Sequence, residues 1–127
     1  MKRRKKIYIL LILTVLWSII IFIGCTMPPA LIPKWNIPHF DKVAHFGFFF
    51  VQSVLISLLF YYQTGKSFLL LIFISTFWAF VYGGTIELLQ GAFFNRTADV
   101  YDLCADILGG LFGAMVYPLI LQMVPKK

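Results

Sequence analysis

The chain has 127 residues, of which 61% are hydrophobic, 18% are aromatic and only 13% are charged. A water-soluble domain carries roughly 45–50% apolar and about 25% charged residues, and 14 phenylalanines are more than one small core can bury. This composition predicts an integral membrane protein, because four spans of about 20 residues each would use most of the chain. It excludes a separate soluble catalytic domain, a nucleotide-binding domain and a nucleic-acid-binding module.

The net charge of +6 comes from basic residues that gather at the two ends of the chain. Five of the 11 lysines and arginines form the run 2–6, directly before an apolar stretch, and Lys126 and Lys127 end the sequence. Basic clusters that flank apolar segments are typical of cytoplasmic topology anchors. We therefore expect the lipid bilayer, and no nucleic acid, as the partner of these residues.

Four apolar runs, taken in chain order, predict four membrane-spanning helices. They cover about 7–25, 43–62, 68–89 and 101–124. The link between the first two runs is rich in proline, which cannot continue a helix. We therefore expect an all-α, integral-membrane four-helix bundle with short loops, forming a single domain over residues 1–127.

An even number of spans places both tails on the same side of the membrane. Eight of the 11 basic residues then lie on the side of the tails and Lys66, and three lie on the opposite side. The opposite side also holds all five acidic residues and both histidines. By the positive-inside rule the expected topology is N-in/C-in, so a polar site would open toward the exoplasmic side.

The first apolar run allows two interpretations. A basic start, an apolar run and the end Phe22-Ile23-Gly24-Cys25 resemble a lipoprotein signal with a lipidated cysteine. Such signals prefer Leu to Phe22, and their apolar region usually has about 7–15 residues, whereas this run has 19. We favour an uncleaved first helix and keep a lipidated Cys25 as the alternative. Cys25 and Cys104 are interpreted as packing residues without a disulfide bond.

The second run opens with three polar residues, Asp41, Lys42 and His45. Asp41 and His45 are four residues apart and share one face of a helix. In a purely structural interpretation Asp41 is the N-cap of this helix and Lys42 reaches the membrane surface. That interpretation leaves His45 inside the membrane without a role, so His45 is a candidate functional residue.

Near the outer end of the third run, Glu87 and Gln90 are three residues apart and share a helix face. A carboxylate inside a span costs roughly 2.5–3.5 kcal/mol at the helix centre and less toward the ends. We therefore interpret Glu87 as functional. Gly83 and Gly84 lie one turn earlier and would let a neighbouring helix come close.

The fourth run carries a stripe of Asp99, Asp102, Asp106, Gly109 and Gly113 at spacings of three, four, three and four. This spacing places all five on one helix face. The glycines predict close packing against another helix. Asp99 is either the N-cap or part of a site, whereas Asp102 and Asp106 have no such structural role.

The five carboxylates have few positive partners nearby, namely Lys42, Arg96 and His45. They cannot all ionise in a partly dry pocket, so either one of them holds a proton or a cation binds. Oxygen-rich sites suit Mg²⁺ or Ca²⁺ better than zinc. The carboxylates expected to hold such a divalent cation are Glu87, Asp102 and Asp106. No serine or cysteine is convincingly placed beside a base, so the reaction class stays open.

Taken together, the polar motifs resemble the VanZ-like family of small membrane proteins. The matching pieces, in family order, are Asp41-Lys42-x-x-His45-Phe46, Glu87-Leu88-Leu89-Gln90, Arg96-Thr97-Ala98-Asp99-Val100-Tyr101-Asp102 and a helix with Gly109, Gly110 and Gly113. The resemblance runs from Pro28 to about Val116, and Asp106 departs from it because the family usually has Asn there. It implies a bacterial inner-membrane protein, and its name-giving member is associated with resistance to the glycopeptide antibiotic teicoplanin.

The leading hypothesis is an outward-facing pocket that binds, and in its stronger form also modifies, an amphipathic lipid or precursor of the cell envelope. The candidate catalytic residues are His45, Glu87 and Asp102. The candidates for holding a phosphate or carboxylate are Lys42, Gln90 and Arg96. The candidate orienting residues are Asp41, Asp99 and Asp106. The alternatives are a binding or shielding module without chemistry and, less favoured, a small ion-coupled carrier.

Overall fold

The computed structural model describes residues 2–34 and 36–123. Its four helices are α1 (Arg3–Thr26), α2 (Phe40–Thr64), α3 (Phe68–Phe93) and α4 (Val100–Met123), and a short 3₁₀ turn covers Pro29–Leu31. The structure is 84% helical, and the described residues contain no strand. Each helix is long and apolar enough to cross a membrane. The expected all-α, four-helix membrane fold is therefore confirmed.

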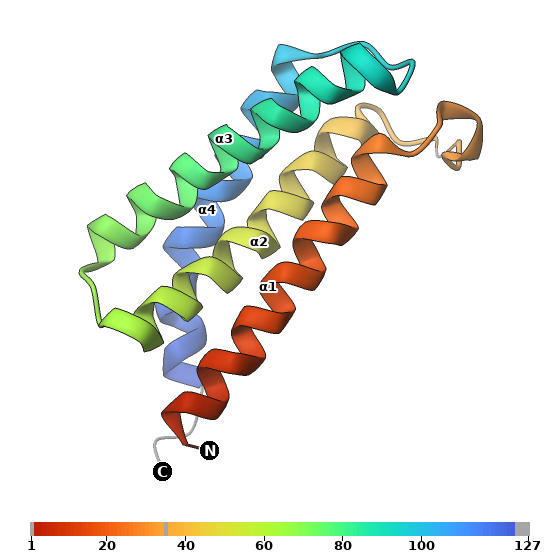
Figure 1. The fold of residues 1–127 in the computed structure, drawn as a ribbon. Coiled ribbons are helices and arrows are strands. Elements are labelled where there is room, and N and C mark those ends of the chain that lie inside the picture. Colours follow the sequence, from red (N-terminus) through yellow and green to blue (C-terminus); the bar gives the residue numbers. More distant parts are fainter. Residues whose placement is uncertain (1, 35, 124–127) are drawn as a thin grey trace.

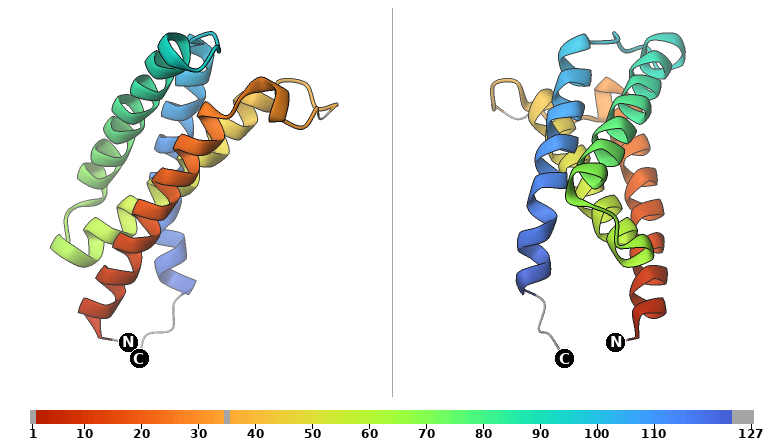
Figure 2. Two further views of the ribbon diagram at one scale, coloured as in Figure 1. Left: turned by 45° about the vertical axis from the view of Figure 1, so that its right-hand side comes forward. Right: turned by 90° about the vertical axis from the view of Figure 1, so that its left-hand side faces the viewer.

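The four helices form an elongated bundle in which α2 lies between α1 and α4 (Figures 1 and 2). α4 packs most extensively against α2 and next against α3, whereas α1 packs mainly against α2. The start of α1 and the end of α4 lie at one end of the bundle, and the α1–α2 and α3–α4 connections lie at the other (Figure 1). The polar motifs of the sequence therefore meet at the end with these two connections.

The start of α2 differs from the expected span. α2 begins at Phe40, and His39, in the left-handed conformation with φ 54°, is its N-cap. The His39 carbonyl accepts the Val43 N–H at 3.1 Å, so Asp41 lies in the first turn. The expectation that Asp41 is the N-cap is therefore wrong, and its carboxylate is available for another partner. The expected last residue of the fourth span, Val124, and the two terminal lysines lie outside the described residues.

Small residues bring α4 close to α2. A Cβ atom on Gly109 would collide with the backbone carbonyl of Phe46, and one on Gly113 would collide with that of Phe50. Backbone cannot move aside as a flexible side chain can, so both positions require glycine. The close approach places the α4 carboxylates directly beside the start of α2.

Of the two glycines expected to let a neighbouring helix approach α3, Gly83 and Gly84, only Gly83 is required by the packing of α4. A Cβ atom on Gly83 would overlap the side chain of Asp106, whereas one on Gly84 would make only an ordinary contact, 3.9 Å from a methyl group of Leu103. Gly83 therefore leaves the space that Asp106 fills, and Gly84 is not required for close packing.

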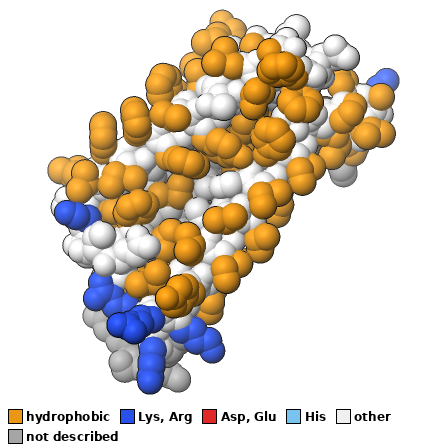
Figure 3. Space-filling view, in the orientation of Figure 1, with side chains coloured by type: hydrophobic (Ala, Val, Ile, Leu, Met, Phe, Trp, Pro, Cys, Tyr) orange, Lys and Arg blue, Asp and Glu red, His pale blue; other side chains and the backbone are white. Residues whose placement is uncertain are grey.

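α1 is tied to the bundle at several depths although most of its surface is exposed and apolar. The Trp17 indole N–H donates to the Phe48 carbonyl at 2.9 Å, and the Tyr82 hydroxyl donates to the Ser18 carbonyl at 2.7 Å. At the end of the bundle where α1 starts, Arg3 donates to the last-turn carbonyl of Tyr62 at 2.6 Å. Figure 3 shows most of the visible basic side chains at this end and hydrophobic side chains over most of the visible face.

Candidate functional site

Polar side chains from α2, α3 and α4 converge where α2 and α4 begin and α3 ends. Four ionisable ones are almost completely shielded from the surroundings: His45 is 2% exposed, Glu87 5%, Asp102 3% and Asp106 0%. Such residues inside membrane-spanning helices are costly unless they bind one another. Their mutual contacts therefore define the site.

His45 is held by two carboxylates. Its Nδ1 lies 2.9 Å from Asp106 Oδ1 and 3.8 Å from Glu87 Oε1. The shorter contact is a hydrogen bond between the ring and the carboxyl group of Asp106. The structure thus places two of the candidate catalytic residues, His45 and Glu87, near each other, with Asp106 as the closer partner of the ring.

Glu87 also joins α3 to the start of α4. Its Oε2 accepts the backbone N–H of Asp99 at 2.8 Å. The other carboxylate oxygen, Glu87 Oε1, is buried and has no hydrogen-bond partner among the described residues, and the same is true of Asp106 Oδ2. Two buried acceptors without donors indicate a place where a proton or a cation would be stabilised.

Lys42 pairs with two carboxylates, that of Asp99, which directly precedes α4, and that of Asp102, in the first turn of α4. Its Nζ lies 2.8 Å from Asp99 Oδ2 and 3.0 Å from Asp102 Oδ1. The hydrogen bond from Lys42, followed by that from the Tyr101 N–H, holds the pKa of Asp99 below its ordinary value. Because Asp99 Oδ1 accepts the Tyr101 N–H at 2.8 Å, Asp99 is both the N-cap of α4 and a member of the site.

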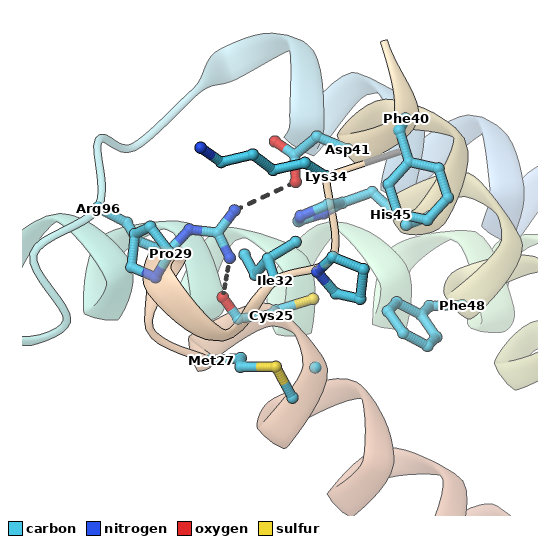
Figure 4. Close-up of a pocket in the computed structure, with 13 residues that line it drawn as sticks. Cys25, Met27, Pro29, Ile32, Lys34, Phe40, Asp41, His45, Phe48 and Arg96 are labelled. Atoms are coloured by element: carbon cyan, nitrogen blue, oxygen red, sulfur yellow. Dashed lines mark hydrogen bonds and ion pairs between the residues drawn. The ribbon is translucent and has the colours of Figure 1, made fainter. Parts of the chain in front are cut away.

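Arg96, in the α3–α4 connection, faces the end of α1 and the start of α2 (Figure 4). It donates to the Cys25 carbonyl at 2.7 Å and to Asp41 Oδ1 at 3.1 Å. The Gln90 amide donates to the same Cys25 carbonyl at 2.5 Å. These donors satisfy a last-turn carbonyl of α1 that has no partner within the helix. Arg96 thus pairs with Asp41, and not with Glu87 or Asp102.

A pocket of about 470 Å³ opens beside these groups. Its walls are the end of α1, the segment after it, the start of α2, and Arg96 (Figure 4). The apolar side chains of the lining include Met27, Pro29, Ile32, Pro33, Phe40 and Phe48. Its polar side is formed by Cys25, Lys34, Asp41, His45 and Arg96. The pocket therefore joins an apolar wall to a charged one.

The predicted residues do not all face this pocket. Glu87 and Asp99 line a second hollow of about 610 Å³ between α3 and α4, whose other lining residues are mostly apolar. His45, Asp41 and Arg96 line the first pocket. The buried contact of His45 with Glu87 and Asp106 lies between the two hollows.

Cys25 is a site residue that the sequence interpretation missed. It is 2% exposed, lines the first pocket, and packs in the buried apolar cluster with Ile21 and Phe49. The sequence feature that could have indicated this is the depth of Cys25 in the membrane. Cys25 ends the first apolar run and His45 lies near the start of the second, so the two residues are expected at the same level of the membrane. Cys104 is exposed, and both cysteines are free, as expected.

Two groups of three side chains bring possible cation ligands within 4.8 Å of one another. One is Asp41, His45 and Asp102, and the other is His45, Glu87 and Asp106. The expected set of Glu87, Asp102 and Asp106 is not among the groups found in the described residues. The second group contains the unpartnered oxygens of Glu87 and Asp106, and the expected divalent cation on Glu87, Asp102 and Asp106 stays a prediction.

The comparison with known proteins identifies one family. The VanZ/LLP1 family model matches residues 4–121, a range that includes all the polar motifs and parts of all four helices. No curated protein and no solved structure matches the chain. A match over nearly the whole sequence, with the family's motifs meeting in one site, shows that this chain is a membrane protein of the VanZ/LLP1 family.

Proposed function

We propose that the first pocket binds an amphipathic, anionic lipid or lipid-linked precursor of the bacterial cell envelope, at the exoplasmic face of the inner membrane. The observation that carries this proposal is that the pocket is lined by apolar side chains together with two basic ones, Lys34 and Arg96. An acyl or prenyl chain would lie against Ile32, Phe40 and Phe48. A phosphate or carboxylate headgroup would lie near Lys34 and Arg96.

Lys34 is the best-placed cation for a headgroup. It lines the pocket, and it forms no ion pair with any residue within the described ranges. Lys42 and Arg96, by contrast, already pair with carboxylates of the chain. An incoming anion would therefore meet Lys34 without first breaking an internal contact.

The test measures binding of phosphatidylglycerol to the purified chain in detergent by native mass spectrometry, with phosphatidylcholine of the same acyl chains as the neutral reference. Lys34→Gln should weaken phosphatidylglycerol binding by up to about fivefold, because an exposed ion pair contributes about 0.2–1 kcal/mol. Lys66→Gln makes the same change at the opposite end of the bundle and should have no effect. Equal affinities of the two variants, or no preference for the anionic lipid, would contradict the proposal.

A binding or shielding role without chemistry is the second candidate. It is favoured by the engagement of Lys42, Asp99 and Asp102 in internal ion pairs, which gives these charges a structural use. In that role, occupancy of the pocket by a precursor would change the access of a glycopeptide such as teicoplanin to its envelope target. Glu87→Asp would then leave antibiotic susceptibility unchanged, whereas a role in proton transfer would not tolerate the shorter side chain.

A further inference from the structure

We propose that His45, Glu87 and Asp106 together bind one divalent transition-metal ion of the Zn²⁺ type, in preference to Mg²⁺ or Ca²⁺. This inference goes beyond the proposed lipid binding and does not depend on it. It also differs from the ligand set expected from the sequence, because it includes the ring of His45 and leaves out Asp102.

The three side chains come from three helices and present their ligand atoms within a small volume. These atoms all lie within 4.8 Å of one another, and His45 Nδ1 lies 2.9 Å from Asp106 Oδ1 and 3.8 Å from Glu87 Oε1. Two ligands bound tetrahedrally to one zinc ion, each about 2.0–2.2 Å from it, are roughly 3.4 Å apart. The two contacts of the ring bracket this distance, so an ion fits between the ring and the carboxylates after small side-chain rotations.

Buried oxygens without donors point independently to a ligand at this place. Glu87 is 5% exposed and Asp106 is 0% exposed, and each keeps one carboxylate oxygen without a hydrogen-bond partner among the described residues. The oxygen of Glu87 is Oε1, which faces the His45 ring at 3.8 Å, too far for a hydrogen bond. Buried acceptors normally have a partner, and a cation is a partner that needs no donor hydrogen.

The charges around this cluster leave two carboxylates for one histidine. The other ionised side chains of the site are already paired with one another, namely Asp41 with Arg96, and Asp99 and Asp102 with Lys42. Within the described part of the chain, Glu87 and Asp106 have only the His45 ring as an ion-pair partner. A protonated ring supplies one positive charge to the two carboxylates. A divalent ion supplies two, and the ring then binds it through a deprotonated nitrogen.

The ligand types select the class of metal. An imidazole nitrogen with carboxylate oxygens suits zinc and related transition ions, whereas Mg²⁺ and Ca²⁺ prefer ligand sets made of oxygen. The other group of possible ligands, which combines His45 with Asp41 and Asp102, is less suitable. Asp41 is exposed, and both of its carboxylates already accept hydrogen bonds from basic side chains.

An ion can approach the cluster from two directions. His45 lines the first pocket, and Glu87 lines the second hollow. Both openings lie at the end of the bundle with the α1–α2 and α3–α4 connections, so an ion does not have to cross the apolar middle of the bundle. Three protein ligands leave a fourth position on a zinc ion for water or a bound molecule.

The experiment measures Zn²⁺ binding to the whole chain, purified in detergent without a polyhistidine tag and freed of metal with EDTA. Equilibrium dialysis against Zn²⁺, followed by elemental mass spectrometry, should give one tightly bound ion per chain. Mg²⁺ or Ca²⁺ in large excess should not displace it. Zn²⁺ should also raise the Tm of the unmodified protein, because an ion that binds only the folded state stabilises it. Cys104→Ala removes the exposed thiol and should leave both results unchanged.

Variants of similar shape identify the ligands. Glu87→Gln, Asp106→Asn and His45→Gln should each weaken Zn²⁺ binding by more than about 100-fold, because losing a residue that only orients a ligand already costs about 10–100-fold. Asp102→Asn makes the same chemical change as Asp106→Asn, four residues earlier in α4. It should weaken binding by less than about tenfold, because Asp102 does not contact the ion. This difference separates the proposed ligand set from the one expected from the sequence.

Three results would overturn the inference. One is the absence of bound Zn²⁺ and of a Zn²⁺-dependent rise in the Tm of the unmodified protein, a result that needs no substitution. Another is loss of binding in Cys104→Ala, which would place the ion on the exposed thiol. The third is an equal loss in Asp102→Asn and Asp106→Asn, which would return the ion to the ligands expected from the sequence. No phospholipid is added, so these outcomes leave the proposed lipid binding to its own test.

Discussion

At the scale of single residues, Asp99 shows how one side chain can serve the fold and the site together. Its carboxylate accepts the Tyr101 N–H and pairs with Lys42, and its backbone N–H donates to Glu87. Any change in its charge therefore affects the start of α4, the position of Lys42 and the orientation of Glu87.

Asp99 predicts a pH dependence with a definite sign. Because Lys42 lowers its pKa in the folded state, ionised Asp99 stabilises the fold above the ordinary pKa of the group, which is 3.8. That stability is lost as the pH falls through the lowered folded-state pKa. Asp99→Asn should therefore lower the Tm in detergent at pH 7, and its difference from the parent should shrink toward pH 3.

The comparison is made on thermal melts of both proteins at several pH values in one buffer series. A difference in Tm that is as large at pH 3 as at pH 7 would mean that the charge of Asp99 does not contribute to stability, and it would contradict the prediction. A difference that vanishes only at low pH supports the ion pair with Lys42.

Most of the site's residue types could be predicted from the sequence, whereas their pairing could not. Intramembrane carboxylates and histidines are costly, so Glu87 and His45 can be singled out from type and position alone. Which carboxylate faces His45 depends on the rotation of α3 and α4, and the structure places Asp106 nearer than Glu87. Cys25 could not be distinguished from a packing residue, because a thiol in an apolar run carries no cost that demands a partner.

At the scale of elements, α4 is held by glycines that meet the backbone of α2. Gly113→Leu should severely destabilise the bundle, because the new side chain meets the Phe50 carbonyl and overpacking costs about 1–3 kcal/mol or more. The measurement is the Tm and the yield of folded protein in detergent.

Gly47→Leu is the matched control for this prediction. Gly47 lies in α2, is exposed, and has no atom within 4 Å of the place a Cβ would occupy. The same substitution should therefore be tolerated there. A Gly113→Leu protein as stable as Gly47→Leu would mean that α2 and α4 can separate without loss, contrary to their close contact.

The helices themselves were predictable because a membrane span needs a long apolar run, and the runs that predict spans lie within the four helices wherever the structure describes them. Their ends were less predictable. α3 continues to Phe93 and α2 starts at Phe40, since polar residues such as Gln90 and Asp41 find partners in the bundle and can remain helical. A hydropathy scale describes the transfer of a single side chain to lipid, and it does not include the hydrogen bonds and ion pairs that polar side chains form within the bundle.

At the scale of the whole molecule, the separation of charge predicts a topology. The α1 start and Lys66 lie at the end opposite the site, so the positive-inside rule predicts that this end is cytoplasmic. In a background without cysteines, Lys34→Cys should react in intact cells with a membrane-impermeant maleimide, and Lys66→Cys should react only after lysis. Labelling of position 66 in intact cells would reverse the orientation and place the pocket at the cytoplasmic face.

The gathering of basic side chains at one end of the bundle and of carboxylates at the other also makes the molecule an electric dipole along its long axis. Moving one elementary charge through a membrane potential of 100 mV changes its energy by about 2.3 kcal/mol. With the predicted orientation, in which the basic end is cytoplasmic, both ends of the bundle would be at the potential that suits their charge in an energised cell, whose interior is negative. The field that drives ion uptake would also oppose any inversion of this protein, and that opposition would weaken when the membrane is depolarised.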